Sequence, residues 1–426
     1  MTLPSAEPAP DGSPGRVALY APEFAADPHA AYRRMRRAHG PLVPVDLAPG
    51  VPATLVIGYY QARRILNDPL HFPADPRAWE KLIPATCPVR PMMEWRPNAL
   101  RSGGAEHARY RAANTHAIDK VDQHGLRALV ERVADGAIDG FRTAGSADLL
   151  TQYSFPIAFR VLSALLGCPD EIGQRIADGM AKIFDTTNAE EGNRILGQAV
   201  LDLVALRRRH PGDDITSRLT LHPAELSDEE MSHQLVTLYG AGIEPLTNLI
   251  SNTILKILTD DDFSADLHAG LSTVRDALDA VLYTDPPMAN YCISYPPYPI
   301  DVEGVLLPAD QPVVISMAAA NNDPALTEGV PEGQHGGNRA HLAWSTGPHT
   351  CPARSHAYLI AETAVTHLLD ALPETDLARP LAELTWRPGP FHRALESLPV
   401  TFPVTPAAAQ HTTHPATHTA THPAAH

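Results

Sequence analysis

The chain has 426 residues, a formal net charge of −16 at pH 7 and a hydrophobic content of 44%. This composition is that of a folded protein with a large core. The acidic balance and the lack of a basic run argue against nucleic-acid binding. We expect no membrane association, because no apolar run is long enough to span a bilayer and the N-terminus lacks the pattern of a secretory signal. The few, widely spaced cysteines, Cys87, Cys168, Cys292 and Cys351, indicate a reducing cytoplasm rather than a disulfide framework.

Both ends of the chain are predicted to lie outside a single folded domain that spans residues 18–404. Residues 1–17 are rich in Pro, Gly, Ala and Ser and are expected to form a disordered arm. Residues 405–426 repeat Ala, Thr, Pro and His and are expected to form a disordered tail. The histidines of the tail could also bind a metal ion weakly.

The N-terminal part combines short helices and strands with a long irregular segment. Patterning predicts helices at 24–38 and 61–67 and strands at 42–47 and 54–59. Residues 73–100 contain many prolines together with Trp79, Met92, Met93 and Trp95. A structureless segment of this length is usually functional, so we expect a ligand-facing loop with Met92 and Met93 among the substrate contacts. A proline-rich surface loop is the alternative.

Two cationic side chains share a face of the helix predicted at 105–117. His107 and Arg111 are four residues apart and therefore lie one turn apart on the same side. Together they could bind carboxylates. A solvated basic face that also includes Arg109 accounts for the same spacing equally well.

The middle of the chain is helical and contains one long, buried helix. Helices are predicted at 124–143, 157–166, 170–183 and 188–210. The long helix starts at a capping box of Ser227 and Glu230, runs to about residue 258 and is apolar on most sides. Its centre reads Gly240-Ala-Gly-Ile-Glu-Pro245, and we expect the helix to bend or open there because proline cannot donate a backbone hydrogen bond. A functional site accounts for this costly pattern, and a simple kink with a satisfied Glu244 is the alternative.

The C-terminal part returns to mixed structure around a cysteine segment. We expect a helix at 273–283, strands at 301–307 and 312–317, and a final hairpin formed by residues 386–391 and 398–404. Between them, residues 339–353 lead through Trp344, Gly347 and His349 to Cys351 and Pro352. An apolar helix follows, with Pro352 suited to its first position. Its N-terminus should favour the thiolate of Cys351, a good soft ligand for iron.

Taken alone, Cys351 is compatible with two further roles. A lone cysteine is often a small buried hydrophobic residue. A zinc site formed with His349 and His356 is also conceivable, although no second pair of ligands completes it.

In their order and spacing these segments resemble cytochromes P450 of the soluble bacterial type, over about residues 18–404. The stretch from His341 to Cys351 resembles the haem-binding loop of the family, with Trp344 where phenylalanine is usual. Ala241-Gly-Ile-Glu244 resembles the groove of the central helix over the haem, and His107 and Arg111 resemble the pair that holds the haem propionates. Asp285-Pro-Pro287 and Asn322-Asp-Pro324 resemble turns of the family.

The resemblance implies a mainly α fold with small β-sheets and haem b between the long central helix and the cysteine loop. Cys351 would be the axial ligand of the haem iron, and Glu244 would take part in proton delivery. Trp344, Ala241, Gly242, His107, Arg111 and His349 would contact the haem, and Ile243 and Pro245 would face the substrate. We therefore expect an oxidoreductase that acts on a small organic substrate with electrons from ferredoxin and ferredoxin reductase.

Several positions depart from the family pattern. The Glu-x-x-Arg pair that braces the core near the cysteine loop should fall at Ala280 and Tyr283, and both members are absent. Pro245 replaces the usual threonine, and the arginine expected after the Pro-Pro turn is missing around residues 290–295. An actinobacterial branch of the family shows a similar loss of the pair and a similar Glu-Pro. These departures keep open a peroxide-driven enzyme, or a haem-binding protein used for sensing or in a complex without turnover.

Overall fold

The computed structural model describes residues 15–184, 189–327 and 339–404. The predicted tail and residues 1–14 of the predicted arm lie outside this range. Residues 15–17 of that arm belong to the fold, because Val17 pairs with Val45 and the Nε atom of Arg16 donates to the carboxylate of Asp46. Within these ranges, no helix is long and apolar enough to cross a lipid bilayer.

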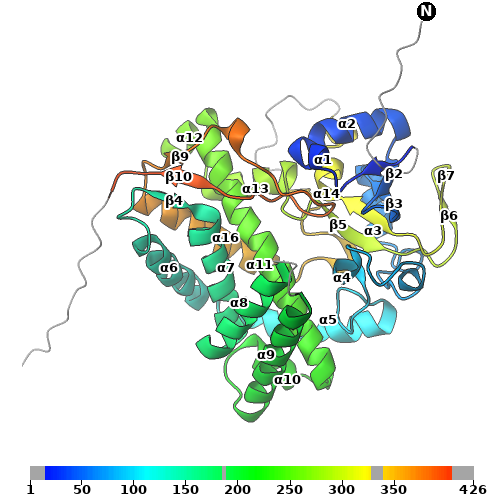
Figure 1. The fold of residues 1–426 in the computed structure, drawn as a ribbon, viewed down its shortest axis with the longest axis horizontal. Coiled ribbons are helices and arrows are strands. Elements are labelled where there is room, and N and C mark those ends of the chain that lie inside the picture. Colours follow the sequence, from blue (N-terminus) through cyan, green and yellow to red (C-terminus); the bar gives the residue numbers. More distant parts are fainter. Residues whose placement is uncertain (1–14, 185–188, 328–338, 405–426) are drawn as a thin grey trace, which may run out of the picture.

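Helices make up most of the molecule, and α11 runs through its centre (Figure 1). The α-helices are α1 (Pro22–Ala26), α2 (Pro28–His39), α3 (Tyr59–Leu66), α4 (Arg90–Met93), α5 (Gly104–Asp119), α6 (Gln123–Asp139), α7 (Phe155–Leu165), α8 (Asp170–Phe184), α9 (Ala189–Arg209), α10 (Ile215–Thr220), α11 (Asp228–Thr259), α12 (Asp261–His268), α13 (Val274–Thr284), α14 (Met317–Asn321), α15 (Pro324–Thr327) and α16 (Arg354–Ala371). Short helical turns lie at η1 (Trp79–Lys81), η2 (Leu150–Ser154), η3 (Gly347–His349) and η4 (Leu381–Glu383).

Within the described ranges, the strands form three small sheets with the orders β1-β2-β3-β8-β5, β4-β10-β9 and β6-β7. Their bounds are β1 (Val17–Ala18), β2 (Leu42–Asp46), β3 (Pro52–Val56), β4 (Ser146–Asp148), β5 (Asn290–Ser294), β6 (Ile300–Val302), β7 (Val305–Leu307), β8 (Val313–Ser316), β9 (Asp376–Leu377) and β10 (Pro399–Thr401). In Figure 1 the largest sheet lies beside α1 and α2 and away from most of the helices. The expected architecture, mainly α with small sheets, is confirmed.

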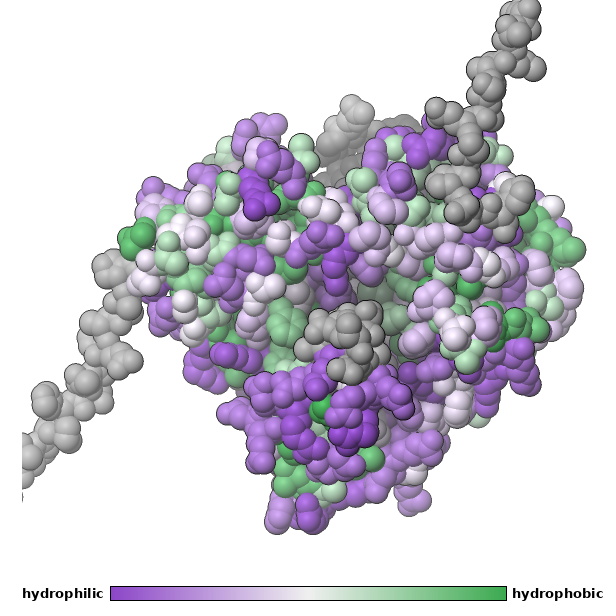
Figure 2. Space-filling model, viewed as in Figure 1, coloured by the Kyte–Doolittle hydropathy of each residue, from purple (hydrophilic) through white to green (hydrophobic). Residues whose placement is uncertain are grey.

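The hydrophobic core is likewise divided between the helices and the five-stranded sheet. The largest cluster of buried hydrophobic residues joins α5, α6, α7, α9, α11, α13 and α16, and two smaller clusters lie around the five-stranded sheet. The predicted capping box starts α11, since the Ser227 hydroxyl accepts from the Glu230 N–H at 3.2 Å and Glu230 accepts from the Ser227 N–H at 2.9 Å. In Figure 2 hydrophilic residues gather on the lobe formed by α9 and α10, at the bottom of the view.

Some predicted elements differ in the structure. The single helix expected at 24–38 is divided into α1 and α2 at Asp27. The segment 301–307 is the hairpin β6–β7 rather than one strand, because Glu303 (φ 54°) and Gly304 (φ 85°) form a tight turn of the left-handed type that hairpins prefer. The predicted final hairpin does not form, because β10 pairs with β4 and β9 while Trp386 pairs with Leu395. The central helix was expected to bend or open at Pro245, and it does not open, because α11 is helical on both sides of this residue.

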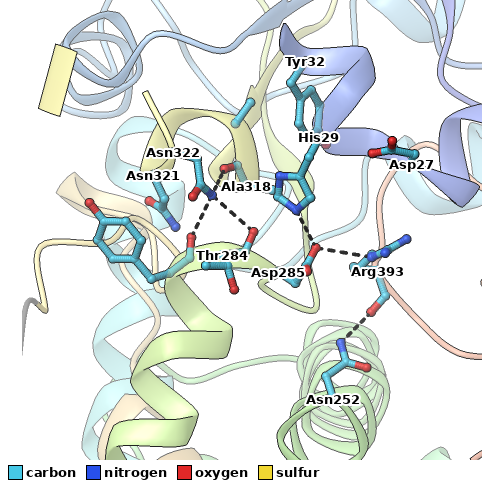
Figure 3. A network of polar contacts seen from close by, with 12 residues as sticks. Asp27, His29, Tyr32, Asn252, Thr284, Asp285, Ala318, Asn321, Asn322 and Arg393 are labelled. Carbon is cyan, nitrogen blue, oxygen red and sulfur yellow. Dashed lines mark hydrogen bonds and ion pairs between the residues drawn. The ribbon is translucent and has the colours of Figure 1, made fainter. Parts of the chain in front are cut away.

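The two proline-containing turns lie close together in space (Figure 3). The side-chain amide of Asn322 donates to the carbonyl oxygens of Tyr283 and Thr284, at 3.3 Å each, and of Ala318 at 2.8 Å. The carboxylate of Asp285 accepts from His29 at 3.0 Å and forms an ion pair with Arg393 at 3.3 Å. These contacts join the end of α13 to the N-terminal and C-terminal segments.

Candidate active site

An apolar cavity lies between α11 and the cysteine segment, residues 339–353. It holds about 930 Å³ of space between atoms, part of it open to solvent. Ala241, Gly242 and Pro245 line it from α11, and Trp344 and Cys351 line it from the cysteine segment. His356 of α16 and leucines of α7 complete much of the wall.

The cysteine segment is a tight loop held by its own backbone. The Cys351 N–H donates to the Trp344 carbonyl at 2.9 Å, and Thr350 donates to the Gly347 carbonyl through both its N–H, at 3.1 Å, and its hydroxyl, at 2.7 Å. Gly347 has a φ of +73°, which strongly favours glycine. The loop is also tied to α14, because the Leu342 N–H donates to the Asn321 side chain at 2.7 Å.

Two opposing influences act on the sulfur of Cys351. Pro352 precedes α16, whose N-cap is Ala353, so Cys351 lies just outside the first turn of the helix. The Ala353 backbone at this helix end lowers the pKa of the Cys351 thiol, as do Arg111 and Arg354, whereas burial raises it and is the largest influence. Binding to a metal ion would supply the charge that deprotonates the thiol.

A cluster of cationic and imidazole groups lies beside the cysteine segment. The rings of His107 and His349 are 4.1 Å apart between centroids, and the side chain of Arg111 donates to the Thr350 carbonyl. Burial, together with His107 and Arg111, lowers the pKa of His349 to about 4, and burial lowers the pKa of His107. The Nε2 atom of His107 is buried without a hydrogen-bond partner within the described part of the chain.

Arg101 belongs to the same cluster and was missed by the sequence analysis. It is only 8% exposed, and its guanidinium donates to the hydroxyl of Tyr291 and to the carbonyl of Met92. Tyr291 lies in the stretch where the family's strand arginine was expected. Over residues 15–184, 189–327 and 339–404, no carboxylate lies within ion-pair distance of Arg101 or Arg111. A buried cation without a counterion is costly, so the cluster is suited to an anionic ligand.

The residues of α11 divide between the cavity and other surroundings. Pro245 faces the cavity, whereas Ile243 is buried in the main core and is not part of the lining. Glu244 also lies outside the lining, where its carboxylate accepts from the Asn248 side chain at 3.1 Å and from Arg387.

The two methionines predicted to contact substrate also lie elsewhere. Met93 is fully buried in the core cluster beside the sheet, and Met92 is 47% exposed. Neither lines the cavity.

The comparisons identify this architecture. The chain is 31% identical over 393 residues to the cytochrome P450 monooxygenase PikC of Streptomyces venezuelae, covering 89% of this chain and 92% of the relative. The chain belongs to the cytochrome P450 family. This P450 is also 28% identical over 402 residues to the vitamin D(3) 25-hydroxylase of Pseudonocardia autotrophica, covering 90% of this chain and 96% of the relative. No protein-family model matches the chain.

Solved structures agree with this identification. CYP154C4 from Streptomyces sp. ATCC 11861 has a TM-score of 0.82 at 27% identity, covering 91% of this chain and 98% of that one. CYP154A1 from Streptomyces coelicolor A3(2) has a TM-score of 0.80 at 26% identity, covering 91% and 100%. The predicted family, fold and oxidoreductase activity are confirmed. Cytochromes P450 of this kind carry haem b, and an apolar cavity lined by Cys351 fits such a group. His107, Arg111, His349 and Arg101 are not part of the lining and lie beside the cysteine segment that forms one wall.

Proposed function

We propose that this P450 oxidises a small, largely apolar organic substrate in the cavity between Cys351 and α11, with electrons from a ferredoxin and its reductase. The observation that carries the proposal is the cavity itself, because Cys351 and Trp344 line it together with Ala241, Gly242 and Pro245 of α11. Haem bound there would supply the activation of oxygen, and the protein would supply its position and surroundings.

In this proposal each part of the site has a distinct task. Cys351 would hold the haem iron through its sulfur, and Trp344, Ala241 and Gly242 would contact the haem. His107, Arg111 and His349, joined by Arg101, would bind the haem carboxylates through charge-assisted hydrogen bonds. Pro245 contributes to the substrate side of the cavity. We do not assign substrate contacts to Ile243, Met92 or Met93, because none of them is part of the lining.

Glu244 is proposed to act at a distance from the cavity. Its hydrogen bonds to Arg387 and Asn248 hold the carboxylate outside the lining, so it could pass protons toward the site only through water. Pro245 has no hydroxyl and no N–H to continue such a path. We therefore expect more peroxide release per turnover than in relatives with a hydroxyl at this position.

The first experiment asks which thiol binds the iron. The purified, haem-loaded protein is reduced under CO, and the wild type should give the long-wavelength band of thiolate-ligated haem. Cys351→Ser should abolish the band, whereas Cys292→Ser should retain it. Cys292 is a stringent control because its thiol is buried close enough for Cys351 to influence its pKa. A band that survives in Cys351→Ser would refute the assignment.

The second experiment asks how electrons reach the site. Apolar small molecules are screened for a shift in the haem spin state, and those that bind are tested for turnover with a ferredoxin system and with peroxide. Product formation with the ferredoxin system supports the proposal. Product formation with peroxide alone would favour the peroxide-driven alternative. A spin shift without product under either condition would contradict the proposed function.

A further inference from the structure

Outside the cavity, a buried carboxylate on α13 joins the segments on both sides of Cys351. Asp279 is only 5% exposed. One oxygen accepts the hydroxyl of Tyr358 at 2.5 Å, and the other accepts Nε of Arg339 at 2.9 Å. Arg275, one turn earlier on α13, lies 3.8 Å from the same carboxylate. A buried carboxylate with two close donors and a nearby cation is well satisfied.

Both direct partners of Asp279 are connected to the cysteine segment. Arg339 begins the cysteine segment, and Tyr358 lies on α16, seven residues after Cys351. The ring of Tyr358 packs against Trp344 with 5.2 Å between centroids, and Trp344 lines the cavity. One carboxylate therefore ties together α13, the start of the cysteine segment and the helix that follows it.

The hydroxyl of Tyr358 is held at the centre of this contact. The guanidinium of Arg275 lies 3.3 Å from the centroid of its ring, and Nε2 of His341 lies 3.3 Å from its oxygen. Burial and the neighbouring Asp279 raise the pKa of Tyr358, so the hydroxyl stays protonated and continues to donate. Replacing either partner would leave buried charge or a buried donor unpaired.

This network lies where the chain lacks the Glu-x-x-Arg pair of the family. Ala280 and Tyr283 occupy the places where an acidic residue and an arginine would brace the core near the cysteine loop, and Asp279 immediately precedes Ala280. We propose that Asp279, through Arg339 and Tyr358, is a positioning residue that braces the cysteine segment in place of the missing pair. This inference rests on the proposed role of Cys351 as iron ligand.

The test compares variants of the haem-loaded protein with a matched buried ion pair elsewhere. Asp279→Ala and Tyr358→Phe remove the brace, and Asp279→Glu is the conservative variant. Asp46→Ala is the control, because Asp46 is also buried, at 1% exposure, and forms an ion pair with Arg16 at 2.9 Å on the far sheet. The readouts are the rate of haem transfer to an excess of apomyoglobin and the fraction of the CO complex that keeps thiolate ligation.

We expect Asp279→Ala to lose haem about tenfold faster than wild type, as is typical when a group that supports a metal ligand is removed. Part of the CO complex of Asp279→Ala should lack thiolate ligation. Tyr358→Phe should show a smaller change in both readouts, and Asp279→Glu should bring both close to the wild-type values. Asp46→Ala should lower the melting temperature without altering either. If Asp279→Ala does not take up haem, Tyr358→Phe and the Asp279→Asn variant decide the question.

Equal haem retention and equal thiolate ligation in Asp279→Asn, Tyr358→Phe and Asp46→Ala would overturn the inference. If the wild type nevertheless shows the thiolate band, the proposed role of Cys351 as iron ligand still stands. A wild type without that band refutes the proposed function instead, so the two failures are distinguishable.

Discussion

Gly347 offers a sharp test of how the cysteine segment is built, because two separate constraints exclude any side chain there. Its φ of +73° is a conformation that costs a residue with a Cβ about 1–2 kcal/mol. A Cβ would also lie 2.2 Å from the carbonyl oxygen of Leu66, at the end of α3. The obstacle is backbone, so the loop has to move away from α3.

The magnitude follows from comparing Gly347→Ala with Gly304→Ala. Gly304 has a φ of +85°, and a Cβ there would meet no atom within 4 Å. The control therefore carries only the conformational cost, whereas Gly347→Ala adds an overpacking cost of about 1–3 kcal/mol. That difference corresponds to a change in the unfolding equilibrium of about 5-fold to 150-fold.

The assay is denaturant unfolding of the haem-loaded proteins, followed by the absorbance of the CO complex. We expect Gly304→Ala to lose modest stability and to retain full thiolate ligation. Gly347→Ala should lose more stability and part of the thiolate band, because the N–H and hydroxyl of Thr350, the residue before Cys351, donate to the Gly347 carbonyl. Equal losses in the two variants, with the band intact in both, would refute the claim that the contact with Leu66 positions the loop.

Three further predictions concern other parts of the structure. Arg109 and the capping box hold the pKa of Glu230 at about 2, against an ordinary value of 4.5, so its contribution is present above pH 4.5 and is lost as the pH falls toward 2. Glu230→Gln should thus lower the free energy of unfolding at neutral pH by roughly 1 kcal/mol after solvent screening. The melting temperature of the variant should also fall less steeply between pH 4.5 and pH 2, and an unchanged pH dependence would contradict this. Arg101→Ala should speed haem loss about tenfold. The control Arg96→Ala removes a partly exposed arginine that pairs with Glu94, and it should not change the rate. Equal rates of haem transfer to apomyoglobin in the two variants would exclude Arg101 from the haem site. Pro245→Thr should raise product formed per oxygen consumed and lower peroxide release, because it returns a hydroxyl and an N–H to a position that lines the cavity; unchanged peroxide release would show that Pro245 does not limit coupling.

Much of the fold was predictable because its long elements carry strong local signals. The capping box of Ser227 and Glu230 places the start of α11, and its apolar residues on most sides indicate a buried helix. The hairpin turn at Glu303-Gly304 was missed because only the glycine carries an obvious preference for the left-handed conformation. The pairing of β10 with β4 joins residues far apart in the sequence, and no local pattern encodes such a partner.

Sequence motifs were enough to predict some residues of the site, but not those whose role depends on being buried. Cys351 and Trp344 line one cavity with Ala241, Gly242 and Pro245, and their contacts with haem and substrate stay predictions. The helix after Cys351, which lowers the pKa of its thiol through the Ala353 backbone, was visible in the sequence, whereas the burial that raises this pKa was not. Arg101 and Asp279 were missed because an isolated arginine or aspartate is ordinarily a surface residue, and only the structure shows each one buried among its partners.

The position of Arg393 has a consequence for the way the chain folds. Its guanidinium donates to the carbonyl of Ala25 at 2.6 Å. Figure 3 shows that it also pairs with Asp285 and that the Arg393 carbonyl accepts from Asn252 on α11, at 3.1 Å. Residues from the beginning, middle and end of the domain thus meet at one residue. During synthesis this junction cannot close until the last part of the domain has left the ribosome. The N-terminal sheet and the helical core must therefore wait, partly assembled, for the final residues to join them, and long-range closure of this kind slows folding.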